Sequence, residues 1–463
     1  MTNKILFILV ILLFFIKIGA AYYTNFDLFG DEAQYWLWSK SLDFGYYSKP
    51  PLLSWFLGVY ASLFGDTFFY LKIFPIFIYL LTAWAFYDLC KSIGLDKKNV
   101  VSCSLIFLFI PAVSFSSFII STDLFLLLFW TLSLGQLVRI EKFARLKSFV
   151  FLGVFLGLAF LSKYAAIYFI ICMLFYFIID KKFRNIFKNN YLGFTLCLVC
   201  ALTVFSPNLI WNFKNGWITL HHTSDNANFE NIEFSFYRGV EFLLIQIFMI
   251  GPFLFLGGVI NIKNYNNSYK QNLLLAFSIP IFLIVFFEAI LVRANANWAA
   301  PALISFFIFL YTAMKDKFFN YINILFNFTF CVIFFSLVGI SYSAKIFDRI
   351  SGIGEFSEKV FYQRLEQNIK KIAVTDRLLF SSMSYYLRNE EIDFYMPYDS
   401  KSKITNHFMI SSPLKKEMFE NFIFIGGVNE INYLINNYSL KKRNVPEYNF
   451  TKREMEIYEV IFD

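Results

Sequence analysis

The stretch "ILFILVILLFFIKIGAAYY", residues 5–23, sets the fold class of this chain. It is long enough to cross a lipid bilayer, since a spanning helix needs about 20 mostly apolar residues. The whole chain has the same character, because 58% of its 463 residues are apolar and 64 of them are phenylalanine. A soluble core of this length cannot hide so much apolar surface, so the sequence predicts an integral membrane protein.

Apolar windows of spanning length recur along most of the chain, and we count about eleven of them. They lie near residues 5–23, 67–90, 100–118, 121–138, 149–162, 163–179, 191–211, 239–261, 272–292, 297–314 and 320–343. The first window follows Lys4 as a signal peptide would, but its long apolar run predicts an uncleaved helix. The sequence therefore predicts an all-α polytopic membrane protein with about 11–13 transmembrane helices.

Lysine and arginine collect in alternate short loops between these windows. The residues are Lys91, Lys97 and Lys98, then Arg139, Lys142, Arg145 and Lys147, then Lys181, Lys182, Arg184 and Lys188, then Lys263 and Lys270, and then Lys315 and Lys317. Under the positive-inside rule these loops face the cytoplasm and the remaining loops face outward. The net charge of +8 thus reflects membrane topology and does not indicate nucleic-acid binding.

Two outward loops are long, residues 24–66 and residues 212–238. The first is rich in aromatic side chains, which suit short helices that lie in the membrane interface. Cys197 and Cys200 form a CxxC pair, but they lie inside the apolar run "FTLCLVCALTV". Packing within a membrane helix explains this pair better than a zinc or disulfide site does.

The composition becomes mixed and polar from residue 344 onward. Short apolar runs predict strands at 371–376, 408–412 and 422–427, and a helical pattern covers 376–389. We therefore expect two domains, a membrane domain over residues 1–343 and a small outward-facing α/β domain over residues 344–463.

Charged residues adjoin the outward ends of several apolar windows. A carboxylate at the centre of a spanning helix costs about 2.5–3.5 kcal/mol on insertion scales, so charges near membrane helices call for an explanation. The candidates for a functional site are Asp31, Glu32, Asp123, Lys163, Glu288 and Arg293. Windows that are distant in sequence place these residues at one membrane face, as a site at the outer interface requires.

Structural explanations compete with a site role for four of these residues. Asp123 is placed as a helix N-cap would be, and Lys163 suits a side chain that snorkels to the interface. Glu288 and Arg293 are spaced as a structural ion pair would be. These alternatives stay open at the level of the sequence.

The remaining polar candidates lie in the two long outward loops. Asp31 and Glu32 can serve simply to solvate the end of the first helix, although a role in chemistry is the sharper hypothesis. His221 and His222 are potential metal ligands. Neighbouring loop residues seldom both bind one metal, and no matching carboxylate cluster accompanies them.

The first long loop carries residue types that suit group transfer from a phosphate. A carboxylate such as Asp31 or Glu32 can take a proton from an acceptor hydroxyl while that hydroxyl attacks a sugar carbon. A lysine such as Lys49 can neutralise a phosphate leaving group as a point charge. A sugar phosphate carried by a membrane lipid would bring both requirements to the outer interface.

Residues 30–65, "GDEAQYWLWSKSLDFGYYSKPPLLSWFLGVYASLFG", resemble the first outward loop of the GT-C membrane glycosyltransferases. The similarity is to the bacterial branch that contains the aminoarabinose transferase of lipid A and to protein O-mannosyltransferases. Further matching stretches follow in order, namely "STDLFLLLFWTLSL", "GLAFLSKYAAIYF", "SPNLIWNFKNGW", "ANWAAPAL" and "TDRLLFSSMSYYLRN". Each motif is weak alone, but the ordered set is fairly specific and covers most of the chain.

The resemblance implies roles for several positions of the first loop. Asp31 matches the acidic residue proposed as the base or acceptor-orienting group, and Glu32 matches its neighbour. Lys49 matches the basic residue that meets the donor phosphate, and Tyr46 and Tyr47 would help to line the sugar pocket.

Two positions depart from the pattern of the aminoarabinose transferases. Gln34 stands where they carry arginine, which leaves one phosphate partner fewer, with Lys163 or Arg293 as replacements. Ser48 stands where they carry an acid, so we expect no metal. No glycine-rich nucleotide loop is found either, and we expect no cofactor.

The resemblance predicts an inverting glycosyltransferase of the bacterial inner membrane. It would move one sugar from a polyprenyl (undecaprenyl) phosphate to lipid A or another part of lipopolysaccharide on the periplasmic side. A protein acceptor is the first alternative, and a lipid or solute transporter is an alternative from another class. The donor sugar stays open among aminoarabinose, galactosamine, galacturonic acid and mannose.

Overall fold

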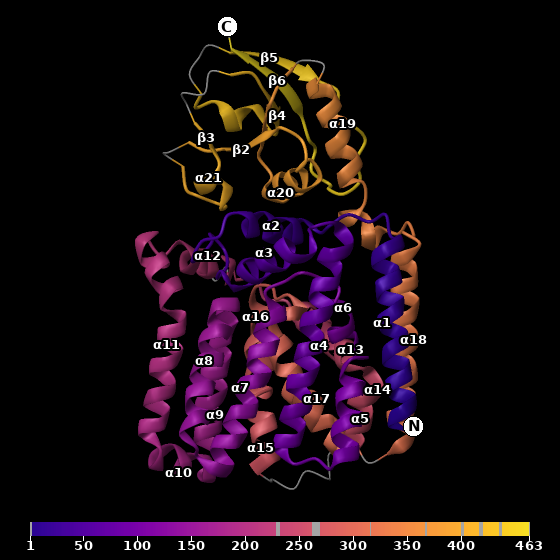
Figure 1. Ribbon diagram of the computed structural model, residues 1–463, viewed down its shortest axis with the longest axis vertical. Coiled ribbons are helices and arrows are strands. Elements are labelled where there is room, and N and C mark those ends of the chain that lie inside the picture. The colour runs from indigo at the N-terminus through magenta and orange to yellow at the C-terminus, as the bar shows by residue number, and fades with distance from the viewer. Residues whose placement is uncertain are drawn as a thin grey trace.

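The computed structural model describes residues 2–227, 232–261, 269–314, 316–365, 368–399, 402–415, 420–434 and 438–462. Its lower part is a bundle of long helices, and its upper part is a domain of strands and helices that carries the C-terminus (Figure 1). A layer of short helices runs across the end of the bundle between these two parts (Figure 1). The predicted fold class is confirmed, since the chain is mostly helical, has candidate membrane spans and ends in a small sheet domain.

Seven helical segments of the described residues are long and apolar enough to cross a membrane, or up to nine if each of two bent pairs is one span. The seven are α1 (Asn3–Tyr23), α4 (Phe68–Ile93), α7 (Asp123–Phe143), α11 (Tyr191–Lys214), α15 (Tyr269–Ala276) with α16 (Ile279–Leu291), η3 (Ala296–Ala299) with α17 (Ala300–Ala313), and α18 (Lys317–Gly339). They account for seven of the apolar windows predicted from the sequence.

The remaining apolar windows are helical too, but their helices are shorter or broken. They form α8 (Leu146–Ser162), α5 (Lys97–Phe107) with α6 (Pro111–Ser116), η1 (Tyr164–Ala166) and α9 (Ile167–Ile179) with α10 (Lys181–Asn189), and α13 (Phe236–Ile250) with α14 (Pro252–Ile260). Proline lacks the backbone N–H that continues a helix, which explains the breaks before Pro111 and Pro252. Gly251 supports the second break with a φ of 104°. The chain therefore has fewer unbroken spans than apolar windows.

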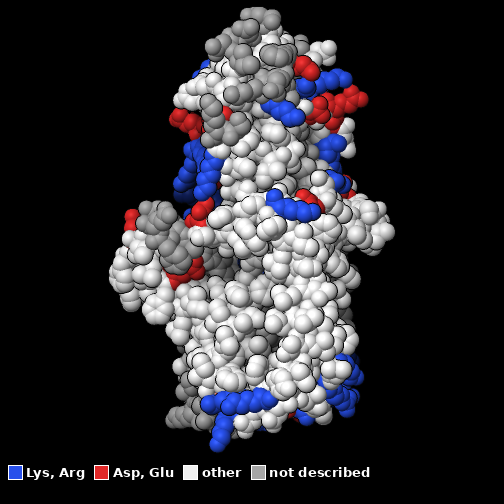
Figure 2. All heavy atoms as spheres, turned by 90° about the vertical axis from the view of Figure 1, so that its left-hand side faces the viewer, with Lys and Arg blue, Asp and Glu red and all other residues white. Residues whose placement is uncertain are grey.

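Cationic side chains gather at the end of the bundle opposite the C-terminal domain (Figure 2). Above them, on the face in view, the middle of the bundle carries almost no charged atoms, as a lipid-facing belt requires (Figure 2). The basic loops meet at this end, because Lys142 donates to the carbonyl of Ser92 and the Lys270 ammonium packs against Gly94. Lys263 and Lys315 lie outside the described residues.

The two long loops predicted to face outward cover the other end of the bundle. The first forms α2 (Gly30–Lys40) and α3 (Leu52–Phe64), which lie across the helix ends, as the aromatic pattern predicted (Figure 1). The described part of the second contains α12 (Ile218–Ala227). α2 and α3 are therefore sandwiched between the bundle and the C-terminal domain.

The C-terminal domain is built on a six-stranded sheet in the order β3-β2-β1-β4-β6-β5. The strands are β1 (Lys371–Val374), β2 (Asp393–Pro397), β3 (Pro413–Leu414), β4 (Phe422–Ile425), β5 (Tyr438–Arg443) and β6 (Ile457–Phe462). β1 is parallel to β2 and β4, whereas β6 is antiparallel to β4 and β5. Its helices include α19 (Ile353–Leu365) and α20 (Arg377–Tyr386). The predicted strands at 371–376 and 422–427 and the helix at 376–389 are confirmed as β1, β4 and α20.

The strand predicted at 408–412 is wrong, because this segment forms the short helix α21 (Phe408–Ser411). The Asn406 side chain accepts hydrogen bonds from the backbone N–H groups of Phe408 and Met409, which favours a helical turn at this point. Phe408 stacks on Phe380 of α20 with ring centroids 4.3 Å apart. A short apolar run does not by itself distinguish a strand from a buried turn of helix.

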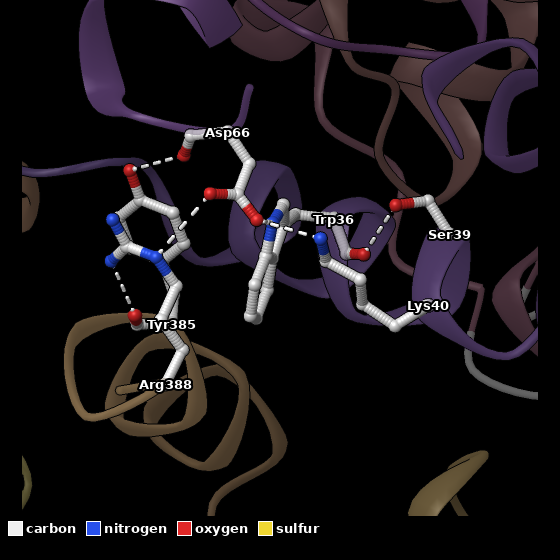
Figure 3. Close-up of polar contacts among 6 residues, drawn as sticks. All are labelled: Trp36, Ser39, Lys40, Asp66, Tyr385 and Arg388. Carbon is white, nitrogen blue, oxygen red and sulfur yellow. Dashed lines mark hydrogen bonds and ion pairs between the residues drawn. The ribbon is translucent and has the colours of Figure 1, made fainter. Parts of the chain in front are cut away.

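The C-terminal domain is held on the first loop through Asp66, which follows α3 (Figure 3). The Asp66 carboxylate accepts from Trp36 Nε1 at 3.0 Å and from the Lys40 ammonium at 2.6 Å, both on α2. The same residue meets two groups of the other domain, because its second carboxylate oxygen lies 3.5 Å from Arg388 Nε and its carbonyl accepts from the Tyr385 hydroxyl at 3.1 Å.

α2 and α20 also approach each other closely. A Cβ at Gly30 would lie 2.7 Å from Cβ of Leu378, so this position has no room for a side chain. The contact brings the N-terminal turns of both helices together. It thereby fixes the first loop against the C-terminal domain at the level where the site described below is found.

Candidate active site

Asp31 and Glu32 both lie in the first turn of α2, but they face different surroundings. Successive residues on a helix point about 100° apart, so two adjacent carboxylates cannot share one environment. Glu32 caps the helix, since its carboxylate accepts from the backbone N–H of Phe29 at 3.0 Å. Its oxygens also bind the Lys72 ammonium at 2.6 and 2.8 Å and accept from Ile120 N–H at 2.9 Å. Glu32 is thus a buried and fully bonded carboxylate.

Asp31 is the accessible carboxylate of the pair, with 41% of its side chain exposed. One oxygen lies 3.2 Å from Nη1 of Arg377, the first residue of α20. Arg377 also donates to the side-chain oxygen of Gln34, one turn further along α2. Asp31 therefore meets its counter-charge across the contact between the two domains.

A cavity of about 290 Å³ opens beside Asp31, between the bundle, the first loop and the C-terminal domain. The side chains in its lining that carry a polar group are Asp31, Gln34, Tyr35, Trp38, Tyr47, Ser48, Lys49, Ser121, Thr122, Asp123, Lys163, His222, Asn295, Asn297, Trp298, Arg377, Thr405, Asn406 and His407. The cavity thus brings together six of the residues singled out from the sequence, namely Asp31, Tyr47, Lys49, Asp123, Lys163 and His222.

Lys49 provides a cation in this cavity that no described group neutralises directly. Two features set the backbone conformation of Lys49. One is a turn, which the hydrogen bond from Tyr46 N–H to the Lys49 carbonyl closes at 3.1 Å, and the other is the following residue, Pro50. Within the described ranges, its ammonium makes no hydrogen bond or ion pair. Burial and the nearby Lys163 lower the pKa of Lys49 to about 8. This group is therefore suited to bind an anion.

Asp123 and Lys163 form an ion pair of 2.7 Å on the bundle side of the cavity. The second oxygen of Asp123 accepts from the Asn297 side chain at 2.8 Å. The N-cap of α7 is Thr122, so Asp123 does not occupy that position. The Lys163 side chain is 14% exposed and paired, which differs from a lysine that snorkels to the interface. Both residues line the cavity, which supports their place among the site candidates.

Aromatic side chains form the wall opposite the bundle. Trp38 and Tyr46 stack with ring centroids 4.5 Å apart, and His407 of the C-terminal domain packs edge-on against both. Tyr46 does not itself line the cavity, whereas Tyr47 reaches it and donates its hydroxyl to the Ile404 carbonyl at 3.2 Å. The buried indole N–H of Trp38 has no hydrogen-bond partner among the described residues.

Arg293, Glu288 and His221 lie away from the cavity lining. Arg293 is exposed, and Glu288 on α16 forms no ion pair with it, so the structural pair considered from the sequence is not found between these two described residues. His221 is exposed, whereas His222 lines the cavity and packs on the Tyr47 ring at 4.8 Å. The described residues contain no group of three or more side chains arranged to hold a metal ion.

Four contributors to this region were not singled out from the sequence: Lys72, Asn297, Arg377 and His407. A lysine inside an apolar window requires a partner, so Lys72 carried a usable signal. Arg377 lies within a quoted motif, but no spacing rule places it beside Asp31, which is 346 positions away. Asn297 likewise lies within the motif "ANWAAPAL", whereas His407 lies in none of the matching stretches.

The helical bundle, the interfacial helices above it and the small sheet domain define a polytopic membrane protein. Its fold is that of ArnT from Cupriavidus metallidurans in the apo state, with a TM-score of 0.65 and 12% identity. The superposition covers 98% of this chain and 97% of the other.

Sequence comparisons agree with this fold. Residues 48–211 match the family model described as dolichyl-phosphate-mannose-protein mannosyltransferase. The chain is 29% identical over 284 residues to the lipid A galacturonosyltransferase RgtD of Rhizobium johnstonii. The aligned region covers 60% of this chain and 59% of that relative. Together these similarities support the assignment of the chain to the GT-C superfamily of membrane glycosyltransferases, as the resemblance predicted.

Proposed function

We propose that the protein is an inverting glycosyltransferase that moves one sugar from a polyprenyl phosphate to lipid A or another part of lipopolysaccharide. The observation that carries this proposal is the cavity in which the accessible carboxylate of Asp31 lies together with the ammonium of Lys49, which has no partner among the described residues. The donor phosphate would bind at Lys49, with the sugar against the aromatic wall. The prenyl chain would extend into the lipid beside the bundle.

The chemistry follows from these two groups. The Asp31 carboxylate takes the proton of an acceptor hydroxyl as its oxygen attacks C1 of the sugar. The bond between C1 and the phosphate oxygen breaks, and polyprenyl phosphate leaves with its charge neutralised by Lys49. One displacement inverts the configuration at C1. Glu32 is a positioning residue in this scheme, because Lys72 and two backbone N–H groups occupy its carboxylate.

The proposed orientation places the cavity on the periplasmic side of the bacterial inner membrane. It rests on the cationic loops at the opposite end of the bundle, which the positive-inside rule assigns to the cytoplasm. No nucleotide donor is expected at the periplasmic side. A lipid-linked donor fits a cavity that lies where the membrane helices end.

Lipid A is favoured as the acceptor because RgtD, a relative over about three fifths of this chain, is a lipid A galacturonosyltransferase. A protein acceptor is the second candidate, since the matching family model is named for protein mannosyltransferases. A transporter accounts less well for charges gathered at one end of the bundle, because alternating access uses a site near the membrane midplane.

Mass spectrometry of lipid A from cells with the gene, without it, and with Asp31→Asn tests the proposal. We expect a sugar-sized mass increment that disappears in both the deletion and the variant, with the variant protein present in the membrane at normal amounts. Unchanged lipid A in the deletion would rule out this acceptor. An increment that survives in Asp31→Asn would rule out Asp31 as the base.

A further inference from the structure

The helix α20 carries Arg377 from the C-terminal domain into the cavity of the membrane domain. Its far end is fixed by Tyr385 and by Arg388, just beyond the helix, which both bind Asp66 (Figure 3). Its near end packs against Gly30, where no side chain intervenes. Because both ends of α20 are fixed on the first loop, the fold defines the position of the Arg377 backbone.

The contacts of Arg377 leave part of its guanidinium group available. Nη1 meets both Asp31 and Gln34, and no hydrogen bond of its other nitrogens joins it to a described residue. A guanidinium has five donors in a planar fork that fits two oxygens of a phosphate. The side chain is 42% exposed and lines the same cavity as Lys49.

The charges of the cavity lining also point to an anionic ligand. Its lysines and arginine are Lys49, Lys163 and Arg377, and its carboxylates are Asp31 and Asp123. One positive charge therefore remains. Burial lowers the pKa of both His222 and His407 to about 4, so neither adds charge near neutral pH. A phosphodiester carries one negative charge and would balance this lining.

We propose that Arg377 is a second phosphate-binding residue, and that the donor phosphate draws it away from Asp31. This inference rests on the proposed function. In the empty cavity the guanidinium is paired with Asp31 and occupies one of its carboxylate oxygens. When a phosphodiester binds between Lys49 and Arg377, the ion pair is exchanged for a phosphate contact and Asp31 is released. The base is then active only when the donor is in place.

The first part is tested by the binding of undecaprenyl phosphate, the phosphomonoester that leaves in the proposed reaction, to the purified full-length protein in lipid nanodiscs. We expect Arg377→Ala to weaken binding about tenfold or more, which is the usual scale for a lost charge-assisted contact. Arg377→Lys should restore part of the affinity, and uncharged undecaprenol should bind the wild type and Arg377→Ala alike. Lys442→Ala is the matched control, because it removes an exposed ion pair with Glu456 at the far edge of the sheet.

A double-mutant cycle tests the exchange. Asp31→Asn should tighten the binding of undecaprenyl phosphate, since it frees Arg377, and this gain should shrink strongly in the Arg377→Ala background. An equal gain in both backgrounds would overturn the exchange, because it would reflect simple repulsion between Asp31 and the phosphate.

The binding measurements distinguish a failure of the proposed role of Arg377 from a failure of the proposed function. If Lys49→Ala weakens binding and Arg377→Ala does not, Arg377 is not a phosphate-binding residue and the proposed function stands. If the wild type does not bind undecaprenyl phosphate more tightly than undecaprenol, the proposed function itself fails. Melting temperatures near that of the wild type would show that each variant is folded.

Discussion

The ammonium of Lys72 lies 2.6 Å from Oε2 of Glu32, and the two side chains are 7% and 1% exposed. This buried pair separates the roles of two adjacent carboxylates that the sequence treats alike. Glu32 has its lone pairs occupied, whereas Asp31 faces a cavity. The pair thereby supports the assignment of the base to Asp31 and of a structural role to Glu32.

Glu32→Gln should destabilise the protein. The substitution leaves the buried Lys72 without its counter-charge, and the loss of one partner of a buried ion pair costs about 3–5 kcal/mol. Asp31→Asn should cost less than about 1 kcal/mol, because its pair with Arg377 is solvent-exposed. Unfolding of the detergent-solubilised protein measures both effects.

The double variant Glu32→Gln with Lys72→Met serves as the control for this prediction. It removes both charges, and it should therefore recover much of the stability lost in Glu32→Gln. A Glu32→Gln protein as stable as the wild type would show that the buried pair does not support the first loop.

The affinity for undecaprenyl phosphate should fall as the pH rises from 7 to 10. Desolvation lowers the pKa of Lys49 to about 8, so the side chain is cationic below that pH and loses its charge above it. An anion binds the cationic form. Lys49→Arg should flatten the profile, because arginine stays charged throughout this range. A wild-type affinity that is constant from pH 7 to 10 would contradict this role of Lys49.

Substitutions of Lys163 and Asp123, which form the neighbouring ion pair, should move the midpoint of this pH dependence in opposite directions. The charge of Lys163 opposes the protonation of Lys49, and the carboxylate of Asp123 favours it. Lys163→Met should therefore shift the midpoint to higher pH, and Asp123→Asn should shift it to lower pH. Binding titrations at a series of pH values give both midpoints, and a shift of both variants in the same direction would refute the electrostatic coupling.

Asp66→Asn should loosen the contact between the domains. The substitution weakens the charge-assisted contacts of Lys40 and Arg388 with one carboxylate, which joins α2 to the end of α20 (Figure 3). Hydrogen–deuterium exchange should become faster in α2 and α20 and stay unchanged in β5 and β6. If α20 keeps its protection in Asp66→Asn, the domains are held mainly by the packing at Gly30 and Leu378.

The sequence predicted the features that local composition controls. Apolar windows located the helices, and the spacing of cations located one end of the bundle, because both signals arise within one segment. Proline and glycine positions explain why some windows form broken helices. The run at 408–412 was assigned to the wrong element, since the Asn406 cap and the contact with Phe380 decide its conformation.

For the site, the sequence alone located Asp31 and Lys49 on one loop at the membrane interface, because their neighbours along the chain identify that loop. Only the tertiary structure decided which carboxylate is accessible and which cation meets it. The adjacent side chains of Asp31 and Glu32 on α2 point in different directions. Glu32 contacts Lys72 and Asp31 contacts Arg377, and Arg377 in particular is distant from α2 in sequence. Such contacts are set by how helices and domains pack, and no local pattern of residues encodes them.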